Sequence, residues 1–151
     1  MAVSLKFRLK NIENLTKKFN SKTVTKAVKE GITKGMLRIE AHAKDPILSG
    51  EILKVRTGTL KARTHSEVQT RGSRIVGILK NNTKYARIHE FGGTIKPKRG
   101  EFLVFQPAGA GHLVMVREVK IPARKPFRTA ILAKRKEVIG DIETALKRRL
   151  G

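Results

Sequence analysis

The sequence predicts an α+β fold, in which a mostly antiparallel β-sheet carries two long helices packed on one face. Two apolar stripes with helical spacing, one in the first third of the chain and one at its C-terminal end, predict the helices. Short runs of alternating or β-branched apolar residues, separated by turn-forming residues, predict the strands. With 151 residues, we expect a single domain over residues 1–151.

The first third of the chain predicts a strand and then a long helix. Apolar and polar residues alternate over residues 3–10, which is the period of a half-buried strand. Asn11 is expected to cap a short helix over residues 12–19. The long helix follows Ser21, and its apolar stripe consists of Val24, Val28, Ile32, Met36, Ile39 and Ala43.

Two glycines, Gly31 and Gly35, lie inside this predicted helix. Each costs about 1 kcal/mol relative to alanine in a helix interior. They either weaken the helix or let another backbone approach it closely, and the sequence favours neither alternative. Pro46 is expected to end the helical region, and residues 45–56 to form a loop.

The middle of the chain predicts a hairpin and a short helix or tight turn. The hairpin arms are expected over residues 64–70 and 74–80, joined by Arg71-Gly72-Ser73. The helix or turn is expected over residues 85–91, and Gly92-Gly93 closes it.

The last part of the chain predicts a basic loop, two strands and a closing helix. The loop is expected over residues 94–101, the strands over 102–105 and 113–121, and the helix over 129–150. We expect the loops 45–56 and 94–101 to be mobile in the free subunit and to become ordered at interfaces.

The chain is strongly basic, with 34 Lys and Arg against 12 Asp and Glu and a formal net charge of +22. The basic residues are spread over the whole chain rather than gathered in a tail. Such a charge favours an anionic partner, usually nucleic acid bound through its phosphates. No zinc finger, basic zipper or aromatic single-strand platform is recognisable, so we expect any contact with DNA to be non-specific.

The sequence offers no recognisable catalytic machinery. There is no cysteine, and the histidines have no metal-ligand spacing, so His89 is expected to be structural. No serine lies in a Gly-x-Ser-x-Gly elbow, no phosphate-binding loop is present, and no carboxylate pair is singled out. No apolar run approaches the length of a membrane span. We therefore expect no enzyme activity, metal, cofactor or membrane contact.

Three segments carry a resemblance to a known family. They are Thr57-Gly58-x-Leu60, then Tyr85-Ala86-x-x-His89-Glu90-Phe91-Gly92-Gly93-Thr94, then Ile121-Pro122-Ala123-Arg124-x-Pro126-Phe127. In this order, and followed by a closing helix, they resemble the tail completion and head–tail joining proteins of long-tailed bacteriophages, a group that includes the Mu-like virion morphogenesis proteins. One departure is Lys125, because many relatives place proline directly after the arginine.

The motif residues are expected to be structural, so the resemblance carries over no catalytic residue. Tyr85 and Phe91 are expected to pin the turn to the core, and Gly92-Gly93 to adopt positive φ or allow close backbone approach. Pro122 and Pro126 are expected to stiffen the segment before the last helix. Four residues beside the turn are expected to be exposed and are candidates for an interface or for facing DNA: Glu90, Lys96, Lys98 and Arg99.

The resemblance implies a virion protein that forms a ring, commonly of six subunits, at the head-proximal end of the tail. The ring would cap the tail tube and meet the neck or connector proteins, with genomic DNA crossing its lumen and making transient, non-specific contacts. Assembly would take place in the host cytoplasm. The charge leaves one alternative open, a stand-alone basic protein that binds nucleic acid non-specifically.

Overall fold

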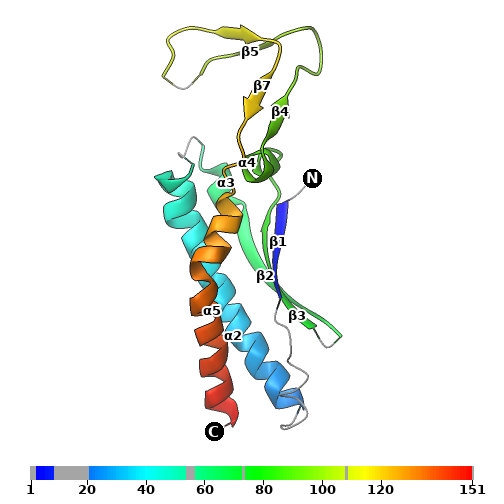
Figure 1. The fold of residues 1–151 in the computed structure, drawn as a ribbon, viewed down its shortest axis with the longest axis vertical. Coiled ribbons are helices and arrows are strands. Elements are labelled where there is room, and N and C mark those ends of the chain that lie inside the picture. Colours follow the sequence, from blue (N-terminus) through cyan, green and yellow to red (C-terminus); the bar gives the residue numbers. More distant parts are fainter. Residues whose placement is uncertain (1–2, 9–20, 54–56, 73, 108, 151) are drawn as a thin grey trace.

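A three-stranded antiparallel sheet and two long helices form the larger part of the molecule, which we call the body (Figure 1). The computed structural model describes residues 3–8, 21–53, 57–72, 74–107 and 109–150. The sheet has the order β1-β3-β2, and its strands are β1 (Val3–Arg8), β2 (Thr64–Arg71) and β3 (Arg74–Asn81). The predicted N-terminal strand and hairpin are confirmed, whereas the predicted helix over residues 12–19 and its cap Asn11 lie outside the described residues.

The two long helices lie on one side of the sheet, which confirms the predicted fold class. Helix α2 (Ser21–His42) packs against β2 and β3, and helix α5 (Pro126–Leu150) packs along α2 (Figure 1). The predicted apolar stripe, which runs along α2 and ends at Ala43 just after it, is the centre of the core, because all six of its residues are at most 1% exposed. Helix α5 begins three residues before the predicted start, at a proline that suits the first helical position.

The structure shows why α2 contains Gly31 and Gly35. A Cβ atom on Gly31 would lie 2.5 Å from the Cα atom of Ile142, and one on Gly35 would lie 2.7 Å from Cγ1 of Val138. The glycines therefore let α5 approach α2 closely, which decides between the two alternatives that the sequence left open. Beside them, the half-exposed Arg38 donates a hydrogen bond of 2.8 Å to the buried carboxylate of Asp141.

The helical region does not end at Pro46, contrary to the prediction. A kinked segment, η1 (Ala43–Glu51), continues from α2. Asp45 is extended (φ −139°, ψ 119°), as expected for a residue before proline, and Gly50 has a φ of 151°. The chain turns back into helical geometry between them because Ile47 and Leu48 are buried in the core. The prediction of a mobile loop over residues 45–56 stays a prediction.

Two short helices lie at the end of the body. Helix α3 (Thr59–Ala62) leads into β2, and helix α4 (Ala86–Phe91) follows β3. The latter confirms the predicted helix or turn over residues 85–91. No described helix is both long and apolar enough to cross a membrane.

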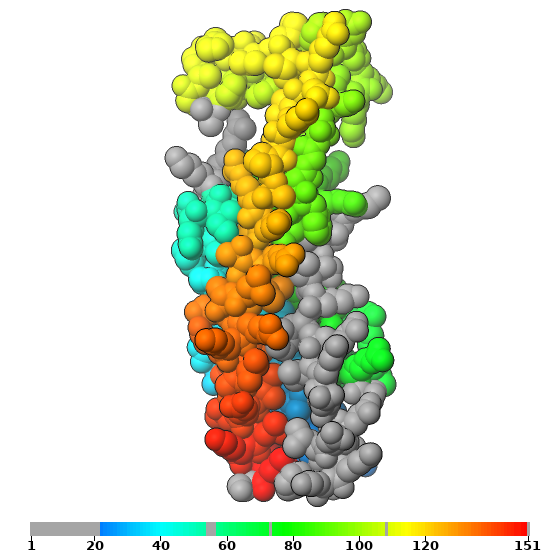
Figure 2. Space-filling model, in the orientation of Figure 1, coloured from blue at the N-terminus to red at the C-terminus, as the bar shows by residue number. Residues whose placement is uncertain are grey.

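Residues 93–121, which we call the arm, project beyond α4 from the end of the body (Figures 1 and 2). Strand β4 (Gly93–Ile95) pairs with β7 (Val119–Ile121), and β5 (Leu103–Phe105) pairs with β6 (Val114–Val116). The single strand predicted over residues 113–121 is therefore two strands, separated by a bend at Arg117 because each pairs with a different partner. Likewise, the predicted loop over residues 94–101 begins only after β4.

Candidate functional site

The motif segments meet where the arm leaves the body. The backbone N–H groups of Arg124 and Lys125 both donate to the carbonyl oxygen of His89, at 2.9 and 3.2 Å. The N–H group of Gly92 donates to the carbonyl oxygen of Ile88 at 2.8 Å, which closes α4. The second and third motifs are thus joined directly by hydrogen bonds, and we call this region the junction.

Glu90 holds the start of α5. Its carboxylate accepts hydrogen bonds from the N–H groups of Phe127 (2.9 Å) and Arg128 (3.1 Å), which are donors in the first turn of that helix. Glu90 therefore acts as an N-terminal cap although it is distant in sequence. Phe127, only 1% exposed, anchors the same turn in the core.

Glu90 is only 2% exposed, so the expectation that it lies on the surface is wrong. Its carboxylate is drawn inward because the first N–H groups of a helix need acceptors. Burial raises the pKa of Glu90, and the two backbone hydrogen bonds oppose this shift.

The glycine pair has the conformation that the sequence predicts. Gly92 has a φ of 71°, and Gly93 has a φ of 155°. A Cβ atom on Gly92 would lie 2.9 Å from the backbone nitrogen of Ala123, so close approach is required as well.

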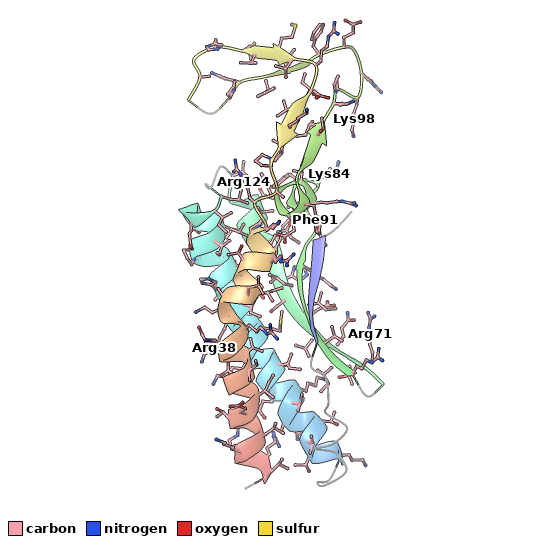
Figure 3. All side chains as sticks on the ribbon, viewed as in Figure 1. Arg38, Arg71, Lys84, Phe91, Lys98 and Arg124 are labelled. Atoms are coloured by element: carbon pink, nitrogen blue, oxygen red, sulfur yellow. The ribbon has the colours of Figure 1, made fainter. Side chains whose placement is uncertain are left out.

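The two aromatic residues of the second motif do not pin the turn to the core, contrary to expectation. Tyr85 is 39% exposed and Phe91 is 61% exposed. The inward face of α4 is instead formed by Ala86 and Glu90, which lie four residues apart on one side of the helix. Tyr85 packs edge-on against His89, with 6.3 Å between the ring centroids. Phe91 remains uncovered at the junction (Figure 3).

The third motif shapes the turn into α5. Pro126 is buried at the first position of the helix. Lys125, the departure from the family pattern, has a φ of 52°, which is uncommon for a residue other than glycine. Pro122 is exposed, and its predicted stiffening role stays a prediction.

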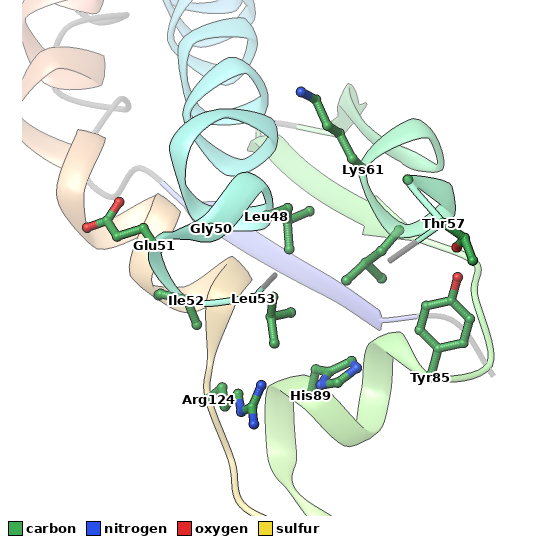
Figure 4. Close-up of a pocket in the computed structure, with 12 residues that line it drawn as sticks. Leu48, Gly50, Glu51, Ile52, Leu53, Thr57, Lys61, Tyr85, His89 and Arg124 are labelled. Atoms are coloured by element: carbon green, nitrogen blue, oxygen red, sulfur yellow. The ribbon is translucent and has the colours of Figure 1, made fainter. Parts of the chain in front are cut away.

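A cavity of about 1000 Å³, which we call the junction pocket, lies beside α4 (Figure 4). Six motif residues line it: Thr57, Gly58, Leu60, Tyr85, His89 and Arg124. The pocket therefore brings together all three motifs. The sequence missed its apolar wall, which includes Leu48 and Leu53, because these residues lie in the segment predicted to be a loop.

The polar groups that line the pocket include His89, whose ring is partly buried. The Nδ1 atom of His89 is buried and has no hydrogen-bond partner among the described residues. Burial lowers the pKa of His89, and the nearby positive charge of Arg124 lowers it further. Within the described parts of the chain, no three His, Cys, Asp or Glu side chains are grouped so that they could hold a metal ion.

The remaining site residues lie on the arm. Lys96, Lys98 and Arg99 are exposed, as expected, and Lys96 lies 3.8 Å from the carboxylate of Glu118. Their role at an interface or facing DNA stays a prediction, and Figure 3 shows Lys98 far from the helices of the body.

The arm also exposes an apolar surface that the sequence did not predict. Val104 lies opposite Met115 in the β5–β6 ribbon, and their exposed fractions are 56% and 64%. Four more large apolar residues of the arm are at least 37% exposed: Ile95, Phe102, Phe105 and Leu113. An isolated two-stranded ribbon is marginally stable in water, so this surface is typical of one that a partner covers. The continuous apolar run over residues 113–116 was the available signal.

The sequence profile of the family described as "Bacteriophage HK97-gp10, putative tail-component" matches residues 6–92. This range covers more than half of the chain and includes the first motif and most of the second. No curated protein and no solved structure matches the chain. The family match agrees with the phage tail family that the ordered motifs resemble. The chain therefore belongs to the HK97-gp10-like family of bacteriophage tail components.

Proposed function

We propose that this tail component forms a ring at the head-proximal end of the tail, where it caps the tail tube and joins it to the neck of the capsid. The observation that carries the proposal is the arm, whose uncovered apolar side chains need neighbouring subunits. In a ring, each subunit presents one surface to the next subunit and a different one to the previous subunit, so every arm can find a partner. The position in the tail and the number of six subunits come from the resemblance of the motifs.

The positive charge fits a ring through which DNA passes. A net charge of +22 attracts phosphates, yet a channel that bound DNA tightly would impede ejection. We therefore propose dispersed, weak and non-specific phosphate contacts in the lumen, and acidic surfaces on the tail tube and neck proteins that pair with the remaining charge.

The same charge favours a second candidate function, a stand-alone protein that binds nucleic acid non-specifically. The mass of the purified protein in solution, at low and moderate salt and with and without tail tubes, separates the two. We expect a hexamer, or a monomer that assembles only on tube ends. A monomer that does not bind tail tubes but binds duplex DNA with a steep salt dependence would overturn the proposed ring function in favour of the second candidate.

A further inference from the structure

We propose that the junction pocket binds a peptide segment that carries apolar side chains and a carboxylate, with Arg124 contacting the carboxylate. The occupant is an acidic segment of another virion protein. Its origin in the virion rests on the proposed function, whereas its chemistry follows from the pocket alone.

The apolar part of the occupant follows from the wall of the pocket. Leu48 and Leu53 are at most 5% exposed overall and line the cavity together with the half-buried Leu60. A cavity of about 1000 Å³ has room for more than one side chain. Leu60 and Ile52 are only half-buried, so placing apolar side chains against them removes apolar surface from water on both partners.

The peptide character follows from His89. Its buried Nδ1 atom lacks a partner within the described structure, although buried polar atoms nearly always have one. An imidazole nitrogen donates or accepts according to the tautomer, and a peptide backbone offers both a carbonyl oxygen and an N–H group. Because this atom is shielded from solvent, a peptide reaches it only when the imidazole turns toward the pocket, and the peptide can then satisfy the atom in either tautomer.

The carboxylate follows from the charges around the pocket. Lys61 forms an ion pair with Asp45 at 2.7 Å. Among the described residues, no carboxylate forms an ion pair with the Arg124 guanidinium. Figure 4 shows the Glu51 carboxylate pointing away from His89 and Arg124. Arginine is well suited to bind a carboxylate with two parallel hydrogen bonds. For a chain with a net charge of +22, an acidic segment of another protein complements the charge around the pocket better than a segment of a second copy does.

The test uses the full chain and three synthetic peptides, acetyl-Leu-Phe-Asp-Leu-amide, the same peptide with Asn for Asp, and acetyl-Ser-Ser-Asp-Ser-amide. The readout is the NMR shift of the His89 imidazole nitrogens during titration. We expect the first peptide to shift them and to bind roughly fivefold to tenfold more tightly than the Asn peptide, because it adds a charge-assisted hydrogen bond. The Ser peptide is expected not to shift them.

Two variants locate the carboxylate. Arg124→Gln is expected to remove the preference for Asp over Asn, because the backbone hydrogen bond from residue 124 to His89 is retained while the charge is lost. The matched control Arg135→Gln removes an exposed charge from α5 that does not line the pocket, and it should keep the preference. Equal affinities for the Asp and Asn peptides, no shift with any peptide, or equal loss of the preference in both variants would overturn the proposal.

A separate assay distinguishes this proposal from the ring. Arg124→Gln and the unchanged chain are compared for self-association and for assembly on tube ends. A chain that forms no ring but still prefers the Asp peptide contradicts the proposed function and supports the pocket. Self-association that is lost in Arg124→Gln, without any peptide preference in the unchanged chain, would place a second copy in the pocket and overturn the proposal.

Discussion

The body and the arm use the same apolar residue types in opposite ways. Met36 in α2 is 1% exposed, whereas Met115 in β6 is 64% exposed, and Val138 in α5 is 0% exposed, whereas Val104 in β5 is 56% exposed. The body therefore stabilises itself by burying its apolar side chains within one chain. The arm leaves its apolar side chains exposed to solvent, so its stability is expected to depend on a partner that covers them.

The junction connects these two regions mainly through polar backbone contacts. Glu90 caps α5, and the carbonyl oxygen of His89 accepts the N–H groups of Arg124 and Lys125. These contacts fix where the arm starts but cover none of its apolar surface. Substitutions in the body, the junction and the arm should therefore have different effects on the isolated chain.

The largest effect is expected in the body, from Gly31→Leu. Its Cβ atom would lie 2.5 Å from the backbone of Ile142, so α2 and α5 must separate. We expect the free energy of unfolding to fall by about 3 kcal/mol or more, measured by urea denaturation.

The matched control is Gly140→Ala in α5, where an added Cβ atom meets no heavy atom within 4 Å. This variant should gain up to about 1 kcal/mol, because alanine favours a helix more than glycine does. Similar losses in both variants would show that backbone propensity, and not close approach of the helices, explains the glycines in α2.

A smaller effect is expected at the junction, from Glu90→Ala. Removing the cap leaves the N–H groups of Phe127 and Arg128 without their acceptor, so the loss should be about 1–2 kcal/mol. Amide hydrogen exchange should become faster at these two groups before the rest of α5. Unchanged exchange there would contradict the capping role.

Glu90→Gln tests the ionisation of the same group. Since burial raises the pKa of Glu90 from its ordinary value of 4.5, the folded chain holds this proton more tightly than the unfolded chain. The resulting stability is fully present below the unfolded-state pKa and is lost as the pH rises through the folded-state pKa. The unchanged chain should therefore lose stability relative to the Gln variant over this window.

The comparison of the two chains is needed because other carboxylates act in the opposite direction. Hydrogen bonds from Arg148 and Lys80 hold the pKa values of Glu30 and Glu67 below their usual range, so these groups stabilise the fold as the pH rises. The unchanged chain and the Gln variant both contain Glu30 and Glu67, so the contributions of these groups cancel in the difference between the two stability profiles. Parallel pH profiles would show that Glu90 ionises in the folded chain as readily as in the unfolded one.

Features that depend on local periodicity could be predicted from the sequence. The stripe of α2 and the two arms of the β2–β3 hairpin follow from spacing and turn residues alone. Predictions failed where a contact distant in sequence decided the outcome. Asp45 and Pro46 predict a helix end, but burial of Ile47 and Leu48 in the core continues the helical segment. Glu90 is predicted to be exposed, but its hydrogen bond to the first turn of α5 buries it.

The smallest effect on the isolated chain is expected in the arm, from the double variant Val104→Thr and Met115→Gln. Both side chains are exposed and face the same side of the ribbon, so the free energy of unfolding should change by no more than about 0.5 kcal/mol. Assembly should nevertheless be lost, because the surface that we propose a partner covers becomes polar. Sedimentation with and without tail tubes measures it.

The matched control is Leu132→Gln on the outer side of α5, where the side chain is 57% exposed. Its exposure is close to that of the arm residues, so exposed apolar area alone predicts the same result for both variants. If the arm is the interface, only the arm variant loses assembly while both keep their stability. Normal assembly of the arm variant would show that the arm contributes no interface, and the contrast with the body would then concern folding alone.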